Sequence, residues 1–180
     1  TSPLERPSRS GGPIVVGGLG GSGTRLVAEI LQQLGIFLGE ELNDARDNLW
    51  FTLLFKRPRW YAKTMSRNPN EVHTGLAILE RALVGRGDAD IAAWAFLLRA
   101  VREAILGGHG QKRAGTPGWP LRQTSHLVRA LCLGPKRTGP WGWKEPNSHI
   151  FLRPMAEHWR DLKFIYVARH GLDMAFSGNQ

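Results

Sequence analysis

The fold of this 180-residue chain is decided by one stretch near its start, PIVVGGLGGSGTR at residues 13–25. Its first half is a short apolar run with β-branched residues that ends in glycines, which is typical of a buried strand over residues 13–18. From Ser22 apolar residues recur every three or four positions as far as Leu34, and Gly35 stands where a helix C-cap belongs. The pattern predicts a strand, a glycine-rich turn and a helix.

The turn contains groups suited to binding an anion, namely Gly20, Gly21, Ser22, Gly23, Thr24 and Arg25. Glycines let N–H groups converge without obstruction by Cβ atoms, and the N-terminus of the following helix adds unpaired donors and its positive dipole end. We therefore expect the turn to bind phosphate. Gly18 and Gly23 have the spacing of the ATP-binding P-loop, but Thr24 occupies the position of that motif's lysine, which argues against ATP hydrolysis.

A second strand is expected far along the chain. Residues 162–168 (LKFIYVA) are almost continuously apolar, which is typical of a central parallel strand buried on both faces, and Arg169 follows at its carboxyl end. Open α/β sheets bind ligands at the carboxyl ends of their strands. We therefore expect this strand to lie near the first one, so that Arg169 and the glycine turn meet at one edge.

The middle of the chain is predicted to be a helical insertion over about residues 48–133. Its first helix is interrupted by Pro58, and an amphipathic helix follows at residues 71–84. A third helix is expected to be capped by Asp88 or Asp90. One face of this third helix is marked by Ile91, Trp94, Leu98, Val101 and Ile105. A glycine- and proline-rich loop then leads to a last helix that begins at residue 121.

The composition is that of one compact domain, expected over residues 13–180 after a disordered arm at residues 1–12. No apolar run approaches the roughly 20 residues that span a bilayer, and the opening residues have no signal-peptide pattern. The lone cysteine, Cys132, lies between two leucines, which predicts a buried thiol. These features favour a cytoplasmic protein without a transmembrane segment.

The formal net charge of +9 favours anionic partners. Residues 1–50 have a net charge of −2, from 4 basic and 6 acidic side chains, so the remaining residues have a net charge of +11. We interpret the basic runs as solvated helix faces or loops rather than a nucleic-acid-binding patch. The first run comprises Lys56, Arg57, Arg59, Lys63 and Arg67, and the second extends from Lys112 to Arg137. The six histidines are scattered and the cysteine has no partner, so we expect no metal site.

The turn's Ser22-Gly23-Thr24 resembles the 5′-phosphosulfate-binding loop of the sulfotransferases that use 3′-phosphoadenosine 5′-phosphosulfate (PAPS). Gly21 stands where that family has a basic residue, and Arg25 or Lys144 is expected to supply the missing charge. Arg169 and Ser177, eight residues apart, resemble the family's 3′-phosphate site. Family members continue beyond this serine with helices and a closing segment, so the resemblance implies a C-terminally truncated domain.

The resemblance also implies a P-loop-type, three-layer α/β fold with a mainly parallel sheet. Lys144, in the segment WGWKEP, resembles the lysine that the family places beside the transferred group, where it would stabilise developing charge. The family's general base is a histidine or a glutamate. Candidates here are Glu40, Glu41, Glu145, His149 and His170. We prefer Glu40, whose pKa burial would raise.

The implied function is sulfuryl transfer from PAPS to a hydroxyl or amine of a small-molecule or glycan acceptor, which leaves 3′-phosphoadenosine 5′-phosphate. Two alternatives stay open at this point. One is a deviant P-loop kinase or nucleotidase, and the other is a nucleotide-binding module without catalytic activity. Aromatic residues of the helical middle are expected to pack in the core rather than line an acceptor pocket.

Overall fold

Three parallel strands organise the structure, a computed structural model that describes residues 11–67, 70–86, 90–107, 118–134 and 136–175. The middle strand is β1 (Ile14–Gly18), with β2 (Gly142–Lys144) on one side and β3 (Lys163–Val167) on the other. Both pairings with β1 are parallel, so the three strands end at the same edge of the sheet. The expectation that the first strand lies near the strand at residues 162–168 is confirmed.

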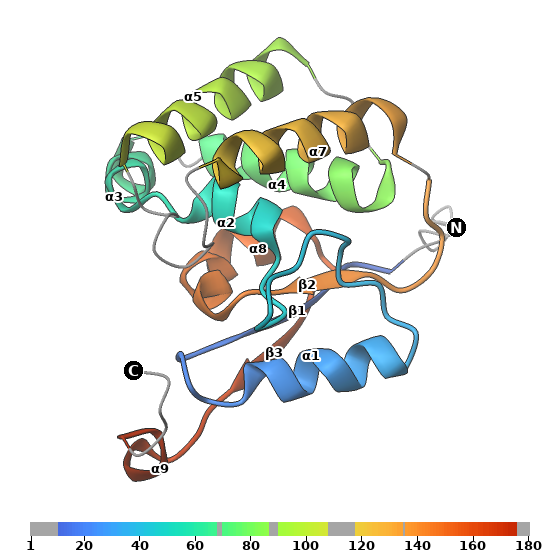
Figure 1. Ribbon diagram of the computed structural model, residues 1–180, viewed down its shortest axis with the longest axis vertical. Helices are drawn as coiled ribbons and strands as arrows, with labels where there is room; N and C mark the ends of the chain where they lie inside the picture. The colour runs from blue at the N-terminus through green and yellow to red at the C-terminus, as the bar shows by residue number, and fades with distance from the viewer. Residues whose placement is uncertain (1–10, 68–69, 87–89, 108–117, 135, 176–180) are drawn as a thin grey trace, which may run out of the picture.

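Helices cover both faces of this sheet (Figure 1). The helix α1 (Thr24–Gln33) follows the glycine turn and packs on one face. The 3-10 helix η1 (Pro146–Phe151) packs on β1 from the other face and continues into α8 (Leu152–His158). Beyond them lies a helical block made of α2 (Leu49–Phe55), α3 (Pro58–Arg67), α4 (Asn70–Val84), α5 (Ile91–Gly107) and α7 (Trp119–Leu133). A short helix, α9 (Gly171–Ala175), follows β3.

The alternation of side chains along β1 divides the core into two clusters. Successive side chains of a strand point to opposite faces of the sheet. Val16 accordingly packs with Ala28 and Leu31 of α1. Val15 packs in the larger cluster, which the helical block supplies. The predicted α/β class with helices on both faces of a parallel sheet is confirmed, in a small sheet of three strands.

The first helix ends as its sequence predicts. Gly35 has a φ of +80°, a left-handed conformation that favours glycine. The N–H of Gly35 donates to the Gln32 carbonyl and the N–H of Ile36 donates to the Leu31 carbonyl, both at 3.0 Å. This pair of bonds is a Schellman motif, which satisfies carbonyls that the helix end would otherwise leave unpaired.

The helices of the middle region follow one another in the predicted order, and the predicted interruption at Pro58 is the boundary between α2 and α3. The first helix, α2, ends at Phe55, and Pro58 opens α3, where its missing N–H costs no helical hydrogen bond. Asn48 caps α2 because its side chain accepts a 2.9 Å bond from the N–H of Phe51. Asp90 caps α5 in the same way, through Ala93 at 2.8 Å. The other candidate cap, Asp88, lies outside the described residues.

The burial predicted for β3 and for one face of α5 is wrong. The strand β3 is not central: β1 is its neighbour on one side, and no described residue pairs with its other side. Tyr166 of β3 is 52% exposed. On α5 the face expected from Leu98 and its companions is largely exposed, and the buried residues are Ala93, Phe96, Leu97, Ala100 and Ala104. This helix is apolar nearly all round, so periodicity alone does not identify the face that packs. The face with small alanine side chains packs because it lets neighbouring helices come closer to α5.

Smaller corrections concern the last helix of the middle region. It begins at Trp119 rather than at residue 121, with Pro120 in its first turn. Cys132 is exposed, not buried, because the helix packs through Leu127 and Leu131 and successive residues point in different directions.

Trp50, Phe51 and Trp60 are core residues, as expected. Residues 1–10, expected to be a disordered arm, lie outside the described residues.

Candidate phosphate-binding site

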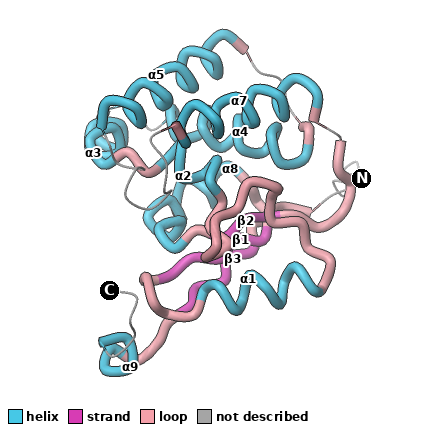
Figure 2. The backbone as a smooth tube through the Cα atoms, in the orientation of Figure 1, coloured by secondary structure: helices cyan, strands magenta, loops and turns pink. Residues whose placement is uncertain are grey.

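The carboxyl ends of the three strands bring the predicted site segments to one edge of the sheet (Figure 2). In the β1–β3 ladder Gly18 lies opposite Val167, and in the β1–β2 ladder Val16 lies opposite Lys144. The glycine turn leaves the sheet directly after Gly18, and Arg169 comes two residues after Val167. Ligands of open parallel sheets bind at this kind of edge.

The glycine turn has the backbone geometry of an anion cradle. Gly21 and Gly23 have φ angles of +81° and +96°, which side-chain-bearing residues rarely adopt. Gly23 is also the N-cap of α1 and provides no side-chain cap. Within the described part of the chain, the N–H groups of Gly20, Gly21, Gly23, Thr24 and Arg25 have no hydrogen-bond acceptor. These donors are therefore available to an external anion.

Two hydroxyl-bearing residues of the turn are buried. Ser22 is 6% exposed and Thr24 is 5% exposed. The Oγ of Ser22 has no hydrogen-bond partner among the described residues, whereas buried hydroxyls are ordinarily paired. Arg25, in contrast, extends into solvent and forms an ion pair at 3.0 Å with Glu29, one helical turn later. The cradle thus consists of backbone amides and small hydroxyls rather than of a cationic side chain.

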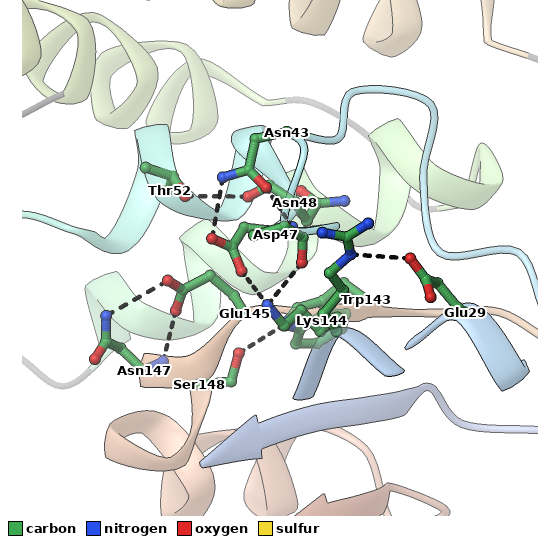
Figure 3. A network of polar contacts seen from close by, with 12 residues as sticks. Glu29, Asn43, Asp47, Asn48, Thr52, Trp143, Lys144, Glu145, Asn147 and Ser148 are labelled. Carbon is green, nitrogen blue, oxygen red and sulfur yellow. Dashed lines mark hydrogen bonds and ion pairs between the residues drawn. The ribbon is translucent and has the colours of Figure 1, made fainter. Parts of the chain in front are cut away.

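Lys144, at the end of β2, is buried and already paired (Figure 3). Its side chain is 3% exposed. The ammonium donates to the Asp47 carboxylate at 2.5 Å and to the Ala45 carbonyl at 2.9 Å. An ammonium has three donors, so one remains beyond these two. The lysine therefore fastens the segment before α2 to the end of β2.

The segment that binds the Lys144 ammonium is a tight turn at residues 43–48, which was not among the predicted site segments. Asn43 organises it: the side-chain oxygen accepts a 2.8 Å bond from the Asp47 N–H, and the side-chain nitrogen donates to the Asp47 carboxylate at 3.0 Å. Arg46 has a φ of +63° and lies 3.9 Å from Glu29 of α1. The available signal was the polar run NDARDN, since Asn and Asp favour such turns.

Glu145 forms a second buried pair beside the first. Its side chain is fully buried and contacts the ammonium of Lys56, at the end of α2. It also caps η1 by accepting a 2.7 Å bond from the Asn147 N–H (Figure 3). Burial raises the pKa of the Glu145 carboxyl, and Lys56 opposes that shift. The carboxylate is thus structural in this geometry, joining β2, η1 and α2.

The raised pKa of Glu145 predicts a pH-dependent effect of Glu145→Gln. An acid whose folded pKa lies above its unfolded value of about 4.5 contributes stability below that value and loses it as pH rises through the folded pKa. Wild type should therefore lose stability relative to the variant above about pH 4.5, by at most about 1.4 kcal/mol per pH unit. Urea unfolding of both proteins between pH 4 and pH 8 measures this slope. A wild type that gains on the variant as pH rises would contradict the assignment.

Arg169 lies at the predicted edge with its guanidinium available. It is exposed, and its Nε lies 3.9 Å from the Asp173 carboxylate of α9. At this distance the pair is loose, so donors of the fork remain free for a ligand. Its expected partner in phosphate binding, Ser177, lies outside the described residues.

The candidate general bases are spread over the structure. Glu40 is 64% exposed at its side chain and pairs with Arg137 at 2.6 Å. Glu41 lies 2.5 Å from His126 and accepts a bond from Gln123, both on α7. Neither carboxylate contacts the glycine turn in the described structure.

The two candidate histidines lie closer to the strand ends. The backbone of His149 lies against Gly17 of β1, and its ring stands edge-on to Tyr166 of β3 with 6.0 Å between centroids. The His149 Nδ1 lies 2.8 Å from the Pro146 carbonyl. His170 is exposed next to Arg169. Of the five candidates, the fold sets two against β1: His149, and Glu145, whose backbone N–H donates to the Val16 carbonyl at 3.1 Å.

Comparisons with protein-family models, with curated proteins and with solved structures gave no match. In the described residues, no group of three or more His, Cys, Asp or Glu side chains is placed to hold a metal ion. None of the helices described here is both long enough and apolar enough to cross a membrane.

Proposed function

We propose that this chain binds PAPS at the carboxyl edge of its sheet and transfers the sulfuryl group to an acceptor hydroxyl or amine. One observation carries the proposal: β1 and β3 are adjacent and parallel, with Gly18 opposite Val167. A glycine turn with free amides and an exposed arginine therefore leave neighbouring strands at the same edge. A nucleotide with phosphates at both its 5′ and 3′ positions offers one anion to each of these groups.

The residues of the turn fit the 5′ end of such a nucleotide. The unpaired amides and the unpartnered Oγ of Ser22 are donors that an anionic oxygen would satisfy. Arg169, with Ser177 on the following segment, would hold the 3′-phosphate. In a P-loop-type fold, the α/β/α arrangement seen here would serve as the scaffold for both contacts.

Transfer would form a bond between sulfur and the acceptor oxygen or nitrogen as the bond between sulfur and the 5′-phosphate oxygen breaks, and a base would take the acceptor's proton. The remaining donor of Lys144 would stabilise charge on the transferred group. We keep Glu40 as the proposed base, which requires its ion pair with Arg137 to open. Activity that survives Glu40→Gln with an unchanged pH profile would exclude it.

A second candidate is a nucleotide-binding module without transferase activity. The observation that favours it is the burial of Lys144 and its pairing with Asp47, which leave the lysine one donor for a ligand. Incubation with radiolabelled PAPS separates the two candidates. A transferase releases 3′-phosphoadenosine 5′-phosphate in the presence of a mixture of hydroxyl and amine acceptors, whereas a binding module retains PAPS intact.

The nucleotide class is tested by thermal unfolding with different ligands. We expect 3′-phosphoadenosine 5′-phosphate to raise the melting temperature, because a ligand that binds only the folded state stabilises it by about 2.7 kcal/mol at 100 times its Kd. ATP with Mg²⁺ should give a smaller shift, since no lysine follows Gly23. A larger shift in melting temperature with ATP and Mg²⁺ than with 3′-phosphoadenosine 5′-phosphate would favour a P-loop kinase or nucleotidase.

A further inference from the structure

A cavity of about 910 Å³ opens within the helical block. Its wall is formed mainly by the end of α2, by α3 and by the second half of α5. Glu71 at the start of α4 and Trp119 at the start of α7 complete the lining. This volume lies in the range of pockets that hold small organic ligands. No residue of the glycine turn takes part.

The lining of the cavity is strongly cationic. Two of its residues are acidic, Glu71 and Glu103, and six are basic: Lys56, Arg57, Arg59, Lys63, Arg99 and Arg102. Three of the six are paired, Lys56 with Glu145, Arg57 with Glu103 and Arg99 with Glu71. The other three, Arg59, Lys63 and Arg102, are exposed and have no acidic partner in the described structure. The cavity therefore has an excess of positive charge at its mouth.

Arg57 supplies a buried cation in the cavity wall. The residue is 5% exposed, and its guanidinium lies over the rings of Trp60 and Phe96, at 4.2 and 4.8 Å from their centroids. Its Nε donates to the Leu54 carbonyl at 2.9 Å. The two terminal nitrogens have no hydrogen-bond partner in the described structure, although Glu103 lies 3.4 Å from one of them in ion-pair contact.

This arrangement is incomplete without a further acceptor. A buried guanidinium ordinarily has its donors satisfied, because unpaired buried donors and charges are costly. Burial lowers the pKa of Arg57 to about 10, so the side chain is still charged at neutral pH. An anionic oxygen in the cavity would pair with both terminal nitrogens in the fork geometry that arginine favours.

The remaining lining is apolar. Leu53, Trp60, Ala104, Leu106 and Trp119 face the same space. Pockets of this composition bury the hydrocarbon or aromatic part of a ligand, while a few polar groups fix its orientation. The combination selects against a bare inorganic ion, which would leave these surfaces without a partner.

We propose that this cavity is a binding site for a small organic anion, in which a carboxylate, sulfate or phosphate group pairs with Arg57 and an apolar body lies against Trp60 and Trp119. Arg59, Lys63 and Arg102 draw the anion to the mouth. The site does not depend on the proposed function at the sheet edge.

The experiment is calorimetric titration with 2-naphthoate, 2-naphthalenesulfonate, the neutral 2-naphthalenemethanol and inorganic sulfate. The two aromatic anions should bind at least about 10-fold more tightly than the neutral alcohol, given the strength of hydrogen bonds to charged groups. They should also bind more tightly than sulfate. If the alcohol binds as tightly as the aromatic anions, the cavity is not an anion site. If sulfate binds as tightly as the aromatic anions, the cavity does not select an organic ligand.

Variants locate the binding within the protein. Replacing Arg59, Lys63 and Arg102 by alanine removes three exposed cations from the mouth and should weaken 2-naphthoate binding at least about 10-fold. The matched control replaces three exposed arginines elsewhere, Arg129, Arg153 and Arg160, with the same loss of charge. Equal weakening in both triple variants would show a bulk charge effect and overturn the site. Arg57→Met, if it folds by circular dichroism, should abolish the preference for the anion over the alcohol.

Discussion

Gly142→Ala is expected to unfold the protein or to lower its free energy of unfolding by roughly 3 kcal/mol or more, the upper range for overpacking a core. A Cβ atom at this position would lie 1.7 Å from the Ile14 carbonyl oxygen, far closer than the 3.0 Å below which real Cβ contacts essentially never fall. The obstacle is backbone of the central strand, so no side-chain rotation relieves it. The substitution forces β2 away from β1 and so displaces Lys144.

Gly139→Ala is the matched control for this variant. Gly139 lies in the loop before β2, its φ is not left-handed, and a Cβ atom there would meet no atom within 4 Å. Its change in stability should stay within about 0.5 kcal/mol. Urea unfolding followed by circular dichroism compares the two variants. Equal stability of Gly142→Ala and Gly139→Ala would contradict the β1–β2 contact.

Arg169→Ala should lower the affinity for 3′-phosphoadenosine 5′-phosphate by about 10- to 100-fold, as expected when a charged hydrogen-bonding group is removed from a phosphate. Affinity for AMP should not change, because AMP has no 3′-phosphate for the arginine to contact. Stability should also be unaffected, since Arg169 is exposed and its contact with Asp173 is long, at 3.9 Å.

Arg153→Ala is the matched control for Arg169→Ala. Arg153 is likewise an exposed arginine with an acidic partner four residues later, Glu157. It lies on α8, which belongs neither to the glycine turn nor to the segment that follows β3. Calorimetric titrations of both variants should show a loss for Arg169→Ala alone. Equal losses would indicate that net charge, rather than a defined phosphate contact, controls binding.

The strand, turn and helix at the start were predictable because local chemistry determines them. The β-branched run, the glycines and Gly35 each restrict the backbone over a few residues, and the structure has β1, the turn and α1 where they were expected. Their adjacency to β3 was expected because the glycine turn and Arg169 were assigned to one ligand at the carboxyl ends of the strands. What that pattern did not indicate is the edge position of β3, because a run of apolar residues does not say how many neighbours a strand has.

The contacts around Lys144 could not be predicted from sequence. Lys144 forms an ion pair with Asp47, and Glu145 forms one with Lys56. The two residues of each pair are far apart in the sequence, so no local pattern connects them. Burial of both pairs is a property of the assembled helical block and sheet. The same holds for Arg57, whose basic run was interpreted as a solvated face, although the side chain lies in the wall of a cavity.

The proposed site binds two phosphates of one nucleotide at two segments of one sheet edge. Calorimetric titration of the unmodified chain with 3′-phosphoadenosine 5′-phosphate and with AMP compares the nucleotide with and without its 3′-phosphate. We expect the 3′-phosphate to tighten binding by at least about 10-fold, the effect of one well-formed phosphate contact. Equal affinities would contradict it, because they would leave Arg169 without a ligand and reduce the glycine turn to a general phosphate site.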